Sequence, residues 1–196
     1  MVFVKRYVAM SDLLETVLNH FARNYLRGVR VKLDARLPRM AGGESDVERK
    51  VIRLSPQQQI NPEAIALGLS YAYRIGPKYR KMKLGKNEVL FLTLLHELGH
   101  FKIKERVPRF YHGLKEEFER RGKVSRDEIP LIEQYIRRRR GETEQSWKLR
   151  IADFESWLVS GESITHHMKV ENWAIDEFEK RRAKIRESLR TAGLAS

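Results

Sequence analysis

An α+β fold that is mostly helical, with a small sheet, is predicted by three features of this sequence. Apolar residues recur at helical spacing along most of the chain, two short stretches alternate apolar and polar residues as strands do, and glycine or proline residues separate these segments. The 196 residues are 41% hydrophobic, which is enough to bury a core of useful size. We therefore expect a single domain over residues 1–196.

The elements before the middle of the chain are expected from spacing and from turn residues. Apolar side chains recur every three or four residues before Gly28, which can end a helix, and alternate with charged ones after it. Asn61 and Pro62 suit the first turn of another helix. The expected elements, in order, are a helix over 11–26 that begins at Ser11, a strand in 29–37, a turn over 41–46, a strand in 47–56 and a helix over 60–75.

The second half of the chain is expected to be helical. Asn87 can cap a buried helix over 87–102, and glycines separate further helices over 114–123, 125–140 and 142–159 before a final one from Ser163. An apolar stripe on the fourth of these helices is expected to dock on the core, and it comprises Trp147, Ile151, Phe154 and Leu158. The mostly charged tail of the final helix is expected to extend into solvent.

Composition excludes several kinds of chemistry. The chain has no cysteine, so disulfides, thiol nucleophiles and thiolate metal sites are excluded. It has neither the pattern of a secretory signal nor an apolar run of about 18 residues, so we interpret it as a soluble, cytoplasmic protein without a membrane span.

Two basic stretches, residues 74–86 and 137–140, accompany a formal net charge of +13. A solvated surface is the simpler interpretation of each. The overall charge still predicts weak, sequence-independent binding to nucleic acid that weakens as salt rises. No spacing typical of a helix-turn-helix or a zinc finger predicts the reading of a specific sequence.

The stretch LLHELGH, Leu94 to His100, carries the pattern His-Glu-x-x-His. On a helix, His96 and His100 lie one turn apart on one face and can direct ring nitrogens at one metal ion. Glu97 can then take a proton from a metal-bound water, an arrangement that hydrolyses peptide bonds. Zinc is the expected cofactor. Gly99 inside this helix indicates that another segment packs closely against it.

A catalytic zinc needs a third protein ligand. Glu171 is the best candidate, because Ala174 shares its helical face and would allow this helix to approach the metal helix closely. His167 lies four residues before Glu171, so it is either a hydrogen-bond donor to the oxyanion or itself the ligand. His166 and Glu119 are the remaining candidates for the third ligand.

The segments HELGH and ENWAIDEF, residues 96–100 and 171–178, resemble the gluzincin clan of metallopeptidases, including the ImmA/IrrE type and the minigluzincin-like proteins. The resemblance implies a zinc endopeptidase with Glu97 as general base and His96, His100 and Glu171 as metal ligands. It also implies a zincin-like fold, in which a small mixed sheet lies above the metal helix and an edge strand, by analogy 47–56, binds a peptide or protein substrate.

About seventy residues separate His100 from Glu171, so the resemblance requires a helical insertion, which we place at 106–161. Two alternative functions remain open. A histidine as third ligand would make the chain similar to SprT-like proteases, which act near DNA. A basic nucleic-acid-binding or adaptor protein on a zinc-bound scaffold is the other alternative, although the intact Glu97 argues against it.

Overall fold

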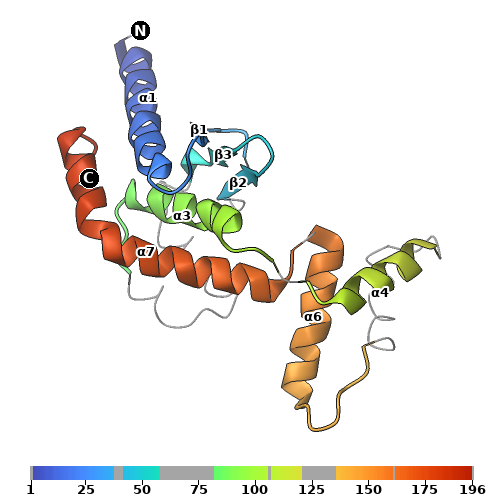
Figure 1. Ribbon diagram of the computed structural model, residues 1–196. Coiled ribbons are helices and arrows are strands. Elements are labelled where there is room, and N and C mark those ends of the chain that lie inside the picture. Colours follow the sequence, from blue (N-terminus) through green and yellow to red (C-terminus); the bar gives the residue numbers. More distant parts are fainter. Residues whose placement is uncertain are drawn as a thin grey trace. The chain divides into compact units, whose positions relative to one another are not determined.

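The structure, a computed structural model, describes residues 2–37, 42–57, 82–105, 107–120, 136–160 and 162–195. The expected α+β class, mostly helical with a small mixed sheet, is confirmed (Figure 1). No helix in these ranges is both long and apolar enough to cross a membrane. The chain divides into two compact units, which we describe separately: a first unit of Met1–Ile103 with Val170–Ser196, and a second unit of Lys104–Lys169.

Three strands form the described sheet of the first unit, in the order β1-β3-β2. β3 (Val51–Leu54) pairs in parallel with β1 (Arg30–Leu33) and antiparallel with β2 (Gly43–Asp46). The expected turn over 41–46 was therefore wrong, since the chain reverses at 47–50 instead, where Lys50 has a φ of 52°. The assignment of 47–56 as an edge strand was also wrong, because β3 lies between the other two described strands.

Helix α1 (Val2–Arg23) packs on β1 of this sheet and on α3 (Glu88–Lys102). It begins well before Ser11, which lies inside it, so the expected start was wrong. The side chain of Asn19 fastens α1 to β1, because its Nδ2 donates to the carbonyl of Val31 at 2.7 Å and its Oδ1 accepts from the Val31 amide at 2.8 Å. Phe21 meets Phe91 of the next helix edge to face, with ring centroids 5.1 Å apart.

Helix α3 (Glu88–Lys102) is the central helix of the first unit. It lies between the sheet and the part of α7 that belongs to this unit, from Val170 onward (Figure 1). Its residues from Glu88 to Leu95 are all buried, as the nearly continuous apolar run predicted. Asn87 precedes the helix, but its side chain does not cap it. Instead its Nδ2 donates to the carbonyl of Leu194 at 2.6 Å.

Helix α7 (Ile164–Thr191) runs from the second unit into the first. Its tail does not extend into solvent as expected, because Ile185 is fully buried and Leu189 is 4% exposed. Arg182 and Arg186 on this tail form ion pairs with Glu88 at the start of α3, at 3.1 and 2.6 Å. These contacts dock the end of α7 against α3.

The second unit has a core of its own, made by α4 (Arg109–Arg120), α6 (Glu144–Ser160) and the chain just before α6. The stripe from Trp147 to Leu158 packs into this cluster, so the core on which it docks is that of the second unit. The buried members are Tyr111, Ile136, Ile151, Phe154 and Trp157.

The helices of the second unit differ in part from those expected. The helix placed at 114–123 begins earlier, at Arg109. The residues 136–140 are not helical, although a helix was expected over 125–140, and the rest of that range lies outside the described residues. The helix expected over 60–75 lies outside them too. The insertion placed at 106–161 falls within the second unit.

Candidate metal centre

His96 and His100 lie on one face of α3, as their spacing predicted. Their Nε2 atoms are 3.2 Å apart. Two nitrogens bound tetrahedrally to one zinc ion at 2.0–2.1 Å would be separated by about 3.3 Å. The two rings therefore already have the separation that a shared zinc ion needs.

Glu171 reaches the same region from α7. Its side chain is only 1% exposed, and its Oε2 contacts Nδ1 of His96. Its Oε1 is buried and has no hydrogen-bond partner among the described residues. Burial raises the pKa of this carboxyl to about 8, because the charged form is poorly solvated there. A cation is the partner that would stabilise the ionised form.

The position of Glu171 relative to the two histidines is specific. It meets His96 at Nδ1, whereas His100 meets His96 at Nε2. A carboxylate in this position can orient the His96 ring, as carboxylates behind metal-binding histidines do, or can bind the ion directly after the ring turns. The structure thus places Glu171 against His96, where its carboxylate could either orient the ring or bind the ion.

The close approach of α7 to α3 depends on Gly99. A Cβ atom at this position would lie 2.7 Å from Cγ1 of Val170 and 3.3 Å from Cε3 of Trp173. The expectation that a segment packs closely on Gly99 is confirmed, and Ala174 one turn beyond Val170 is fully buried. These two small residues allow the carboxylate of Glu171 to reach His96.

Glu97 lies about 100° around α3 from His96, next to β2 of the sheet. It is 6% exposed, and a Cβ atom at Gly43 of β2 would lie 2.8 Å from its Oε1 and 2.9 Å from its Cγ. The same atom would lie 3.0 Å from Cγ2 of Thr93. Gly43 is thus a residue of the site that sequence reasoning missed, because it stood in a segment interpreted as a turn.

The remaining candidates belong to the second unit and are described within it. Nε2 of His167 pairs with Oε2 of Glu162 at 2.7 Å. His166 is buried, and its backbone amide donates to Oγ of Ser163 at 3.2 Å. Glu119 lies on α4, and its side chain is outside the described part of the structure. Their roles stay predictions.

Comparisons of the chain with protein families, with curated proteins and with solved structures found no match. The site is therefore interpreted from its own chemistry. Two imidazole nitrogens and a buried carboxylate form a donor set that zinc accepts, and a second carboxylate, Glu97, follows the first histidine directly. The residues present fit a zinc ion.

Proposed function

We propose that this protein is a zinc-dependent endopeptidase. The observation that carries the proposal is the pair of Nε2 atoms of His96 and His100, 3.2 Å apart, beside a buried carboxylate whose Oε1 has no partner among the described residues. We assign His96, His100 and Glu171 as the metal ligands. Zinc held by them would supply a Lewis acid that polarises the scissile carbonyl and activates a water molecule.

The other residues have separate roles in the proposed reaction. Glu97 accepts a proton from the attacking water and passes it to the leaving nitrogen, and its burial keeps competing water away. His167 donates a hydrogen bond to the oxyanion that forms on the substrate carbonyl. β2 is at the edge of the described sheet, with Gly43 against Glu97, so an extended peptide that adds to β2 would place its backbone beside the general base.

The first test is metal content. Protein refolded with zinc and then dialysed should retain about one zinc ion per chain by elemental analysis, because the donor set is that of a single catalytic site. The His100→Ala variant should retain far less. Wild-type protein that retains no zinc would overturn the proposal.

The second test separates metal binding from catalysis. Glu97→Gln should keep the zinc and the fold but lower hydrolysis of a peptide library by about 10²–10⁴-fold, the usual contribution of a general base. Loss of zinc from this variant would show that Glu97 has another role. His167→Ala should keep zinc and lose about 10²-fold in turnover, as removal of one oxyanion donor does.

One observation favours a second candidate. Glu171 contacts Nδ1 of His96, as an orienting carboxylate would, and a histidine would then be the third ligand, as in SprT-like proteases. In that case zinc would be lost from His166→Ala or His167→Ala and largely kept by Glu171→Ala. The gluzincin arrangement predicts the reverse.

A further inference from the structure

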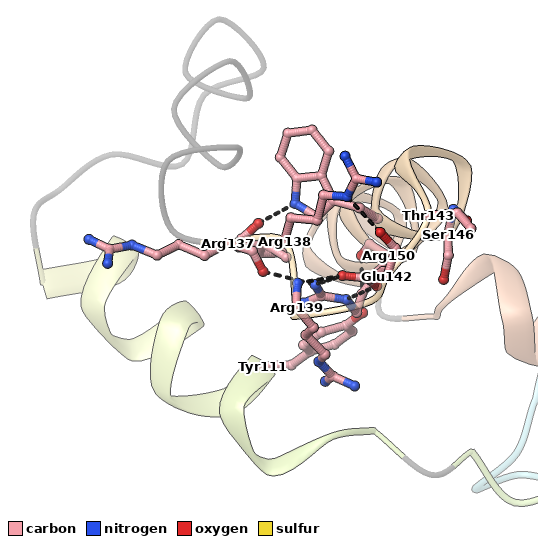
Figure 2. A network of polar contacts seen from close by, with 10 residues as sticks. Tyr111, Arg137, Arg138, Arg139, Glu142, Thr143, Ser146 and Arg150 are labelled. Carbon is pink, nitrogen blue, oxygen red and sulfur yellow. Dashed lines mark hydrogen bonds and ion pairs between the residues drawn. The ribbon is translucent and has the colours of Figure 1, made fainter.

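The segment before α6 carries four consecutive arginines, Arg137 to Arg140, and all four are exposed. Figure 2 shows the first three of them, together with Glu142 and Arg150. Ile136, just before them, is 2% exposed and belongs to the core of the second unit. Gly141, just after them, has a φ of +79°, which turns the chain back toward α6. We call the range 136–143 the arginine loop.

The acidic residue of the arginine loop, Glu142, is fully engaged by neighbouring donors. Arg150 of α6 donates from Nη2 to its Oε2 at 2.7 Å and from Nε to its Oε1 at 3.1 Å. The backbone amide of Arg139 donates to the same Oε2 at 2.9 Å. Both carboxylate oxygens are therefore used inside the unit, and Arg150, not an arginine of the loop, neutralises the charge.

Further hydrogen bonds fix the backbone of the arginine loop. Arg138 donates from Nε to the carbonyl of Glu142 at 2.6 Å, and Arg150 donates from Nη2 to the carbonyl of Arg137 at 3.0 Å (Figure 2). The indole of Trp147 donates to the carbonyl of Ile136. The loop is held in one conformation before any partner arrives, so a partner need not supply the free energy of ordering it.

Within the described part of the chain, the other arginines of the loop have no carboxylate in direct contact with their guanidinium groups. Among the described residues, no carboxylate forms an ion pair with the guanidinium of Arg137, Arg139 or Arg140. Like charges on neighbouring residues repel one another, and a bound polyanion would relieve that repulsion. Guanidinium groups also match phosphate oxygens with two parallel hydrogen bonds.

We propose that the arginine loop binds the phosphate backbone of nucleic acid. A nucleic acid offers phosphates at regular intervals, which suits several neighbouring cations, and the net charge of +13 attracts such a polyanion from a distance. An anionic membrane suits the loop less well, because none of the exposed residues of the loop has a large apolar side chain that could enter lipid. The inference does not depend on the proposed peptidase activity.

The test is a salt titration of binding to a short fluorescent DNA duplex and to the single strand, measured by anisotropy with the full chain. The loop variant combines Arg137→Gln, Arg139→Gln and Arg140→Gln, and keeps Arg138 because it holds the Glu142 carbonyl. The control variant removes the same charge from three exposed positions of the first unit, and it combines Arg23→Gln, Arg27→Gln and Lys184→Gln.

Binding by the loop variant should fall about ten- to a hundredfold at low salt, and the slope of log affinity against log salt should flatten by about 2 to 3, since each phosphate contact contributes close to one unit. The control variant should lose less than about threefold, because its charges act only at long range. Circular dichroism and melting of both variants confirm that the fold is kept.

Two results would overturn the inference. The first is a loop variant that binds DNA as tightly as the control variant does. The second is wild-type protein that binds polyglutamate or anionic vesicles as tightly as DNA at the same salt, with the same loss in the loop variant, which would assign the loop to another partner. Zinc content measured on the same samples reports on the metal site separately.

Discussion

Glu171 and Glu142 are both glutamates with little exposed surface, one in each unit, but their surroundings affect a negative charge in opposite ways. Hydrogen bonds from Arg150 and from the Arg139 amide lower the pKa of Glu142 to about 2. Burial raises the pKa of Glu171 to about 8. Both oxygens of Glu142 are bonded, whereas Oε1 of Glu171 has no partner among the described residues.

We infer that the difference is the one between a carboxylate with a structural role, such as Glu142, and one that binds a cation, as proposed above for Glu171. A carboxylate that fixed cations already satisfy stabilises the fold and has no further capacity to bind a cation. A carboxylate that is desolvated beside two histidines costs free energy until a cation binds, which is typical of functional sites. Glu88 is of the first kind: burial would raise its pKa, but hydrogen bonds from Arg182, Arg186 and the Gly85 amide lower it to about 2.

The largest expected effect tests whether Glu171 is a functional carboxylate. Glu171→Ala should lower zinc affinity by more than about 100-fold, which is beyond the loss usually caused by removing a carboxylate that only orients a ligand. Competition with a chelator of known affinity measures it. The matched control, Glu142→Ala, should bind zinc as wild type does. A loss of only about tenfold in Glu171→Ala would show that Glu171 orients His96.

The second effect concerns Glu97, the other buried carboxylate of the site. Gly43→Ala should lower peptidase turnover by about 10²-fold with zinc retained, because the new methyl group displaces the Glu97 side chain and small misplacements are costly in catalysis. The overpacking should also destabilise the fold by about 1–3 kcal/mol.

The control for this variant is Gly113→Ala on α4, where a Cβ atom would meet nothing within 4 Å. It should keep full activity and gain slightly in stability, since alanine is the better helix former. Turnover is measured at saturating peptide, and unfolding in urea. A Gly43→Ala variant with normal turnover would mean that Glu97 is not the proton acceptor, or that β2 shifts enough to accommodate the new methyl group.

The third effect is the pH dependence of the stability that Glu88 contributes through its ion pairs. The pKa of Glu88 is about 2 in the folded state and near 4.5 when unfolded, so its stabilisation is complete above about pH 4.5 and is lost as the pH falls through about 2. Glu88→Gln should lower the free energy of unfolding by about 1–2 kcal/mol at neutral pH, after allowance for solvent screening.

The difference between wild type and Glu88→Gln should shrink steadily toward pH 2, as measured by urea unfolding across that range. Glu187→Gln removes the same charge from an exposed position of α7 and should change stability by less than about 0.5 kcal/mol. A Glu88→Gln difference that does not change with pH would mean that its ion pairs contribute nothing to stability.

The smallest effect tests the polar network of the second unit. The hydroxyl of Tyr111 donates to the carbonyl of Arg150 at 3.2 Å, so Tyr111→Phe should cost about 1 kcal/mol, the usual net value of one such bond. Zinc content should not change. Thermal unfolding, with metal analysis of the same sample, checks both statements. A change in zinc content would contradict the view that the hydrogen bonds around Glu142 do not affect the metal site.

The helices that carry the candidate site could be predicted from the sequence. The apolar run before His96 required a buried helix, and Gly99 indicated the close contact that Val170 makes. The contact of Glu171 with the Nδ1 atom of His96, on the side of the ring away from the His100 contact, could not be predicted, because spacing specifies a helix face and not the atom that a side chain meets.

Strand β2 shows why part of the fold was missed. Its residues Gly43, Glu44, Ser45 and Asp46 have low strand propensity, so local preference favoured a turn, and pairing with β3 together with packing on α3 overrides it. The docked tail of α7 carried a usable signal, since Ile185 and Leu189 are four residues apart on one face. Because most residues around them are charged, the segment was interpreted as exposed to solvent.

The separation of His96 and Glu171 by 75 residues has a consequence for biosynthesis. The ribosome makes α3 with both histidines first, and then all of Lys104–Lys169 before Glu171 is added. A nascent chain of that length therefore carries His96, Glu97 and His100 without the carboxylate that contacts His96 in the folded protein. Under the function proposed above, hydrolysis that requires Glu171 would begin only after translation has passed the second unit.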